Sequence, residues 1–469
     1  MISYYPKTFT KKAVSIYIVL LMIVSLVFMK FSMKFNFMLS GIVSVVCFFH
    51  FSNVLPKKWA HVPEASFGKK LFVTALIIRV VWVFLSALMF WEIYGDLFDF
   101  EHFDSVYYDY LGKQGHELLV KGGFKNNFEA FVVLPISDQG YPVYMAFMYY
   151  LFDDSVILLR LVKAIFGAWT CLLIYKLGSR EFGTRVGRLA GIMCMLMPNL
   201  IYYCAIQLKE IEMVFLAVLF VERASAILKQ NKFVASQTII LVFVGSLLFF
   251  FRTALAVTLF LAFFIAIVFT SNRVVGIGKK IIIGLLVFSV IGVAVGGAMI
   301  EEINEMYKSR DSQEQNMEWR AEREGGNKFA KYAGRSVFAP LIFTIPFSSM
   351  VNIEGQEHTQ FLNGGNYVKN VTSFFTILAL IMLLMSGDWR KHVLVISMLC
   401  GYLVIMAMSA FAQSERFHQP VLSFELMFAA YALCNLKKKH ARFFNIWMIF
   451  IFVAEIGWNW FKLAGRDLI

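Results

Sequence analysis

Residues 71–104 read LFVTALIIRVVWVFLSALMFWEIYGDLFDFEHFD, an apolar run that gives way to an acidic stretch. The run from Leu71 to Trp91 contains one charged residue, Arg79, and has the length that a helix needs to cross a bilayer, roughly 20 residues. Acidic residues follow from Glu92 to Asp104 with no Lys or Arg among them. The stretch therefore predicts a membrane span followed by a loop on the side of the membrane that basic residues avoid.

Similar apolar runs recur along the 469 residues, of which 59% are hydrophobic and 16% are charged. An average soluble domain has about 25% charged residues, so this composition excludes a soluble enzyme and a protein with a single anchor. The excess of 44 Lys and Arg over 31 Asp and Glu is explained better by cytoplasmic loops and anionic headgroups than by nucleic acid.

Apolar runs of span length predict an all-α polytopic membrane protein with about thirteen transmembrane helices. These runs are 13–29, 36–51, 71–91, 155–178, 187–207, 211–228, 237–251, 253–270, 281–300, 371–385, 392–411, 419–436 and 444–461. The first run follows several lysines as a signal peptide would. No small-residue cleavage site follows it, so we expect a retained span.

Basic residues predict the topology. With the N-terminus in the cytoplasm, every cytoplasmic connection has a basic cluster, which satisfies the positive-inside rule. Two long loops, 92–154 and 301–369, then lie outside. Four regions are expected: two additional spans in 1–70, a transmembrane core in 71–300 that includes the first loop, a lid-like loop in 301–369, and C-terminal spans in 370–469.

The second loop contains a short apolar piece, Phe338–Met350, that is interrupted by Pro340 and Pro346. It is too short and too kinked to span, so we expect it to be re-entrant or to lie on the membrane surface. The glycine pairs 325–326 and 364–365 are expected to be flexible joints around it, as in a lid that selects a substrate.

Several ionisable residues in or beside spans fall on the outer face, where such groups are candidates for function. Asp104 starts an amphipathic stretch of the first loop, and Lys209 with Glu210 occupies an outer turn. Arg252 interrupts the apolar run 238–269. The remaining candidates are Arg416 and His418 in a late outer turn and Tyr108 and Asp138 in the first loop.

A carboxylate and several cations on one face suit a transfer reaction from a phosphate leaving group. The carboxylate deprotonates the acceptor, and the cations stabilise the negative charge that develops on the phosphate. Nucleotide sugars are not available outside the cytoplasm, so the expected donor is linked to a polyprenyl phosphate. The candidates for binding its phosphate are Lys209, Arg252, Arg416 and His418, and the candidates for a second acid or for acceptor binding are Glu210, Asp138 and Tyr108.

Short motifs occur in a fixed order between Asp104 and Glu210. They are Asp104 followed by Tyr108, then QGYP (139–142), LRLVK (159–163), GSREFGTR (178–185), Pro198 and LKE (208–210). A weaker motif, RFHQP (416–420), follows near the end of the chain. In this order the chain resembles the GT-C superfamily of integral-membrane glycosyltransferases, which includes protein O-mannosyltransferases and the aminoarabinose transferases that modify lipid A.

The resemblance implies a glycosyltransferase that uses a polyprenyl-phosphate-linked sugar and a glycan, lipid or protein acceptor. It implies a place in the bacterial cytoplasmic membrane, with the active site on the extracytoplasmic side. Asp104 is expected to be the catalytic base or to lie at the acceptor.

Two other functions stay open. The first is a polysaccharide polymerase or ligase of the O-antigen type, although its key Arg and His residues are expected in the late loop. The second is a flippase for lipid-linked oligosaccharides or another transporter, but no repeat relates the two halves of the chain.

Metal and redox sites are not indicated by the sequence. His102 and His116 lack metal-binding spacing, so no metal ligands are assigned and a divalent ion stays an open question. The six cysteines form no CxxC pair and are expected to be small core residues. Arg79 is expected to reach the cytoplasmic headgroups.

Overall fold

The computed structural model describes residues 7–100, 102–121, 136–229, 235–269, 318, 321–322, 326–329, 338–409 and 412–469. Within these ranges the regular secondary structure is helical, apart from a single antiparallel bridge between Ser32 and Val351. The protein is an all-α membrane protein, as its sequence predicts.

The helices of the first half are α1 (Lys7–Val27), η1 (Met29–Phe31), α2 (Phe35–Lys58), α3 (Glu64–Tyr94), α4 (His102–Val120), α7 (Ile136–Phe152), α8 (Val156–Phe182), α9 (Thr184–Leu196), α10 (Pro198–Tyr202), η2 (Tyr203–Ala205) and α11 (Glu210–Lys229). Those of the second half are α12 (Ala235–Phe251), α13 (Thr253–Phe269), η3 (Ala339–Leu341), α16 (Glu357–Phe361), α17 (Asn363–Ser386), η4 (Asp388–His392), α18 (Val393–Met408), α19 (Glu415–Cys434) and α20 (Lys438–Ala464).

In the described residues, seven helices are long and apolar enough to cross a membrane. They are α1 from Phe9 onward, α2, α3, α8, α17, the stretch Asp388–Met408 and α20. The pair Thr184–Leu196 and Pro198–Ala205, which is bent by 58° at its break, would make an eighth span if it crosses the membrane as one unit.

The expected count of about thirteen spans is not confirmed. α12 and α13 are apolar but have 17 residues each. α11 and α19 have 20 residues each, but charged residues such as Glu222 and Glu425 lie inside them. The expected span 281–300 lies outside the described residues.

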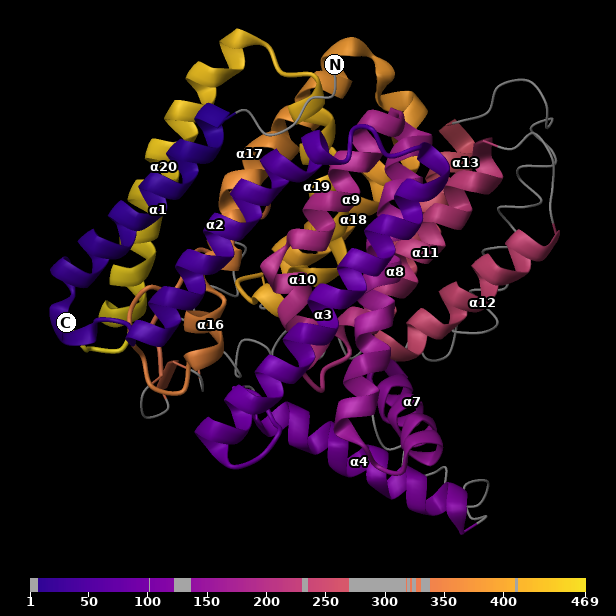
Figure 1. Cartoon of the computed structure of the whole chain (residues 1–469), viewed down its shortest axis with the longest axis horizontal. Coiled ribbons are helices and arrows are strands. Elements are labelled where there is room, and N and C mark those ends of the chain that lie inside the picture. Colours follow the sequence, from indigo (N-terminus) through magenta and orange to yellow (C-terminus); the bar gives the residue numbers. More distant parts are fainter. Residues whose placement is uncertain are drawn as a thin grey trace.

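The long helices run side by side, and α4 lies crosswise at one end of them (Figure 1). α8 is at the centre, where it packs against α3, α9 and α11, and α19 packs against α9, α11 and α17. The two additional N-terminal helices pack on the last part of the chain: α1 contacts α20, and α2 contacts α17 (Figure 1).

The central pair α8 and α9 is shaped by its glycines. α8 ends at Gly183, whose φ of +92° lies in the left-handed region and lets the chain turn directly into α9. A Cβ added at Gly178 would lie 3.1 Å from the Cα of Gly187. The missing side chains therefore allow the two helices to approach closely.

Arg79 does not reach headgroups, because it is fully buried in the bundle. Its Nη1 donates to the carbonyl of Ala75 at 3.2 Å, and its Nη2 contacts the sulfur of Cys171 at 3.4 Å. The expectation for Arg79 was wrong, since α8 and α9 both pack against the face of α3 on which it lies. All six cysteines are free; Cys171, Cys194 and Cys204 are buried, and the other three are partly buried.

The second half of the expected surface piece Phe338–Met350 is buried inside the protein. The backbone N–H of Ser348 donates to Glu455 Oε2 at 2.8 Å, and that of Met350 donates to Asn459 Oδ1 at 2.7 Å. Glu455 and Asn459 are four residues apart and therefore share one face of α20. That face satisfies the backbone of the segment, which corrects the expectation of a piece lying on the membrane surface.

The pair Gly364–Gly365 is also not a flexible joint, because both glycines are buried in the first turn of α17. A Cβ added at Gly364 would lie 2.8 Å from the Cα of Gly41 on α2. The pair is thus a place of close helix packing between α17 and α2.

We expect Gly364→Ala to destabilise the protein by about 1–3 kcal/mol, because the added methyl group meets backbone atoms that cannot move aside. Thermal unfolding in detergent measures this loss. The matched control is Gly457→Ala in α20, where an added Cβ has no atom within 4 Å. A Gly364→Ala variant as stable as this control would contradict close packing at Gly364.

Candidate active site

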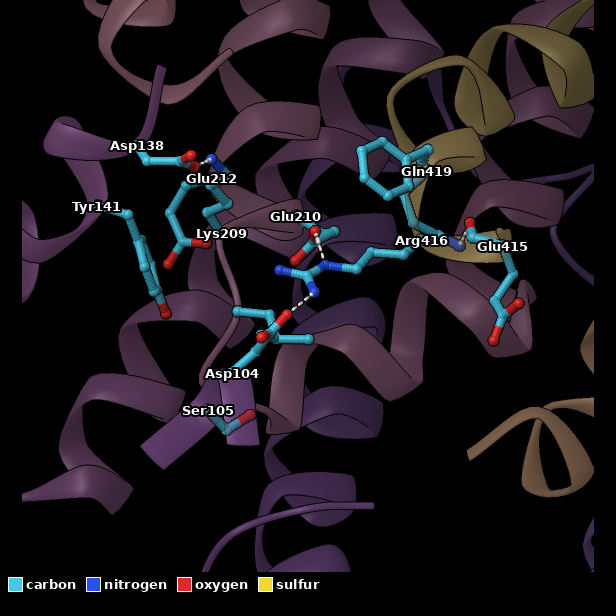
Figure 2. A network of polar contacts seen from close by, with 12 residues as sticks. Asp104, Ser105, Asp138, Tyr141, Lys209, Glu210, Glu212, Glu415, Arg416 and Gln419 are labelled. Carbon is cyan, nitrogen blue, oxygen red and sulfur yellow. Dashed lines mark hydrogen bonds and ion pairs between the residues drawn. The ribbon is translucent and has the colours of Figure 1, made fainter. Parts of the chain in front are cut away.

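Three segments that are distant in the sequence meet near α4. Arg416, in the first turn of α19, donates from Nε to Glu210 Oε1 and from Nη1 to Asp104 Oδ2, each at 2.5 Å (Figure 2). Glu210 is the first residue of α11 and is fully buried, whereas the side chain of Asp104 is 48% exposed. The structure therefore brings three of the predicted site residues into one hydrogen-bonded group, with Asp104 on its accessible side.

Beside this group, Lys209 forms an ion pair with Asp138 (Figure 2). Lys209 is buried, and this burial lowers the pKa of its ammonium group, while the charge of Asp138 acts in the opposite direction. Tyr108 packs edge-on against Tyr141, with ring centroids 5.1 Å apart. Burial raises the pKa of Tyr108, and Asp138 raises it further, so its hydroxyl stays a hydrogen-bond donor at neutral pH.

Arg252 lies between α12 and α13 with its guanidinium 4.1 Å from the ring centroid of Phe417. Phe417 directly follows Arg416, and the charge of Arg252 also lowers the pKa of Lys209. Arg252 is thus directed at the site. In the described part of the chain, no ion pair joins it to a carboxylate.

His418 lies apart from this group. Its Nε2 is 2.8 Å from the carbonyl oxygen of Ala412, and its Nδ1 is 2.9 Å from the Nζ of Lys369, so both ring nitrogens are used inside the protein. The helix begins at Glu415, and two residues along an α-helix are about 200° apart around its axis. His418 therefore cannot share a face with Arg416, and the structure does not support its role in phosphate binding.

Two buried cations of α8 support the site but were not assigned from the sequence. Arg160 donates to the carbonyl of Leu97 at 2.6 Å, and Lys163 donates to the carbonyl of Leu208. These contacts fix the chain just before α4 and the turn that carries Lys209. The sequence contains a pattern that could have identified Arg160 and Lys163. Two charges three residues apart inside an apolar run lie on one helix face, and such charges are rare in spans.

A cavity of about 510 Å³ adjoins the site. Its lining begins at Gln139 and Gly140, next to Asp138, and includes Glu212, two residues after Glu210. The other lining residues are apolar or aromatic and come from α7, α8, α11 and α12: Val143, Tyr144, Phe147, Phe166, Phe215, Leu216, Leu247, Phe250 and Phe251. Phe147 and Phe250 are about half exposed, so the cavity opens at the surface of the apolar helices.

A second cavity of about 690 Å³ lies between α2 and α3 and shares no lining residue with the first. No group of three or more His, Cys, Asp or Glu side chains suited to a metal ion occurs in the described residues. The side chain of His116 lies 2.6 Å from Asp154.

Comparison with known proteins does not identify the chain: no family model matches it, and neither a curated protein nor a solved structure is significantly similar to it. Membership of the GT-C superfamily stays a prediction, and the geometry of the site is what supports a function for this chain.

Proposed function

We propose that the protein is a membrane glycosyltransferase that moves a sugar from a polyprenyl-phosphate donor to an acceptor on the extracytoplasmic side. One observation carries the proposal: a group of carboxylates and cations adjoins an apolar cavity that opens among the lipid-facing helices. A lipid-linked sugar has a charged phosphate and a long hydrocarbon chain in one molecule. Its binding site therefore needs charged residues and an apolar cavity next to each other.

Asp104 is the general base of this reaction. The acceptor hydroxyl oxygen forms a bond to the anomeric carbon, the bond from that carbon to the phosphate oxygen breaks, and the hydroxyl proton passes to Asp104. Arg416 holds the Asp104 carboxylate in one orientation, and the exposed half of Asp104 lets an acceptor approach. Glu210, buried behind Arg416, fixes the guanidinium in turn.

Arg252 and Lys209 are the residues that bind the phosphate. Arg416 lies between two carboxylates and Lys209 pairs with one, Asp138, whereas no carboxylate pairs with Arg252 in the described residues. The planar guanidinium group matches two phosphate oxygens, and Lys209 adds a second charge beside it. The leaving phosphate is stabilised as the glycosidic bond breaks.

We expect Arg252→Gln to weaken binding of polyprenyl phosphate by about tenfold or more, because a charge-assisted hydrogen bond is lost. Lipid binding is measured on protein in nanodiscs by the increase in thermal stability that the bound lipid causes. Arg390→Gln is the matched control, since Arg390 also lies over an aromatic ring, that of Trp389 at 5.5 Å, but in the turn between α17 and α18.

The transfer itself is tested by incubating the wild-type protein in nanodiscs with a radiolabelled polyprenyl-phosphate mannose or glucose and a membrane extract. Release of polyprenyl phosphate together with a labelled product supports the proposal. A wild-type protein that neither binds polyprenyl phosphate nor releases it would contradict the proposal.

A further inference from the structure

The second cavity, of about 690 Å³, runs along one face of α2 and has no part in the proposed transfer. Its lining on α2 begins at Asn36 and reaches Phe51. From residue 36 to residue 51, at 1.5 Å per residue, the cavity extends roughly 22 Å, more than half of the roughly 30 Å hydrocarbon thickness of a bilayer. It is therefore long enough to hold one hydrocarbon chain of a lipid in a single leaflet.

Small side chains on α2 leave this space open. Ser40, Ser44 and Cys47 follow one another at intervals of three or four residues, so they share one helix face, and all three line the cavity. α9 packs against both α2 and α3 and closes the back of the cavity, where Leu196 lines it. The cavity thus forms because α2 and α3 share a neighbour but do not fill the space between them.

The cavity opens toward the bilayer. Leu39 and Val43 on α2 and Leu85 on α3 line it and are about half exposed at the surface of the apolar helices. At the end of α2 that contacts α16, the rings of Trp82 and Phe361 form part of its wall, stacked with centroids 5.8 Å apart. This is the end of the bundle at which α4 lies (Figure 1). A lipid of the leaflet on that side can therefore enter sideways.

Two lysines lie beside this end of the cavity. Lys30 and Lys34 belong to the turn between α1 and α2, both are exposed, and the turn from Phe28 to Lys34 contains no acidic residue. Lys34 directly precedes α2, two residues before Asn36 of the cavity lining. In the described part of the chain neither lysine takes part in an ion pair. Their charges are thus available to an anionic group at the mouth of the cavity.

The turn that carries the lysines is held in place by the second half of the chain. The backbone N–H of Asn352 donates to the carbonyl of Phe31 at 2.8 Å. The side-chain amide of Asn363 donates to the carbonyl of Phe37, in the first turn of α2, at 3.1 Å. Because this backbone is already fixed, binding of an anion by the lysines costs little ordering of the main chain.

We propose that this cavity binds one anionic membrane lipid from the leaflet on the side of α4, with a hydrocarbon chain between α2 and α3 and its phosphate at Lys30 and Lys34. The apolar walls take the chain, and only an anionic headgroup pairs with the two lysines. The site gives the additional N-terminal helices a role that does not depend on sugar transfer, since α2 forms its wall and the turn after α1 supplies its cations.

The test uses full-length protein in detergent and native mass spectrometry, which measures the affinity for the first bound lipid. The probes are phosphatidylglycerol, which is anionic, and phosphatidylcholine with the same chains, which has no net charge. We expect the wild type to prefer phosphatidylglycerol by about tenfold, and Lys34→Gln to lower this preference about fivefold without changing the affinity for phosphatidylcholine. Ser44→Phe, which fills the cavity, should weaken binding of both lipids by about tenfold or more.

Val46→Phe is the control for Ser44→Phe, because Val46 is an exposed residue of α2 outside the cavity lining. Lys439→Gln, at an exposed lysine near the start of α20, is the control for Lys34→Gln. Equal affinities of the wild type for the two lipids, or equal binding by Ser44→Phe and Val46→Phe, would overturn the proposal. Displacement of the lipid by excess glycerol phosphate would assign the lysines to a free phosphate and overturn the lipid site. If Ser44→Phe does not fold, the lipid preference of Lys34→Gln decides.

Discussion

Replacement of Asp104 by asparagine is expected to reduce sugar transfer by roughly 10²- to 10⁴-fold, because an amide cannot take the proton of the acceptor hydroxyl. The fold should not change. Asp104 is half exposed, and the amide oxygen of asparagine can still accept the hydrogen bond from Arg416. Donor binding should also persist, since the phosphate and the lipid chain contact other residues.

Radiolabelled transfer measured under single-turnover conditions, together with donor binding, separates these two effects. Glu117→Gln is the matched control on the same helix, because Glu117 is 68% exposed and pairs with Lys121, one turn away. Transfer by Asp104→Asn at a rate near that of the control would remove Asp104 from the mechanism.

Arg416→Met should be the most destabilising of the site variants. It leaves the fully buried Glu210 without its ion partner, and breaking a buried ion pair in this way costs about 3–5 kcal/mol. Transfer should be lost as well, because Asp104 is no longer held. Lys391→Ala is the comparison at the surface: it breaks the ion pair of Lys391 with Asp388, in which the lysine is 74% exposed. This variant should lower the free energy of unfolding by less than about 1 kcal/mol.

The double variant Arg416→Met/Glu210→Met distinguishes the structural role from the catalytic one. It removes both buried charges, so thermal stability should recover much of the loss while transfer stays absent. A double variant as unstable as Arg416→Met would show that the loss does not come from the stranded carboxylate.

The sequence pattern anticipated which polar residues lie together, whereas the expected number of membrane crossings is not confirmed. Asp104, Lys209, Glu210 and Arg416 lie at helix ends, so the alternation of spans and basic loops was enough to put them on one face. His418 was expected in a turn with Arg416, but it lies in the helix that begins at Glu415, and helix phase separates it from Arg416.

Other features depend on contacts between distant segments, which local patterns do not contain. Ser348 is buried because Glu455, 107 residues later, accepts its N–H. Glu222 of α11 and Glu425 of α19 are buried in the bundle, and length and hydropathy alone do not reveal such contacts. Glu212 escaped assignment because it looks like an ordinary charge at a helix end until the cavity that it lines is seen.

The contacts that α1 makes with helices late in the chain have a consequence for biosynthesis. Lys12 donates to Asn445 at 2.7 Å, across 433 residues, and Tyr17 donates to Asn363. At about 5–20 residues per second, the ribosome needs roughly 20 to 90 s to make α20 after α1. During that interval α1 stays in the membrane without α20, on which it packs in the folded protein. Chains that stop before α20 should therefore be recognised as unassembled and degraded, even though all the residues proposed for catalysis have already been made.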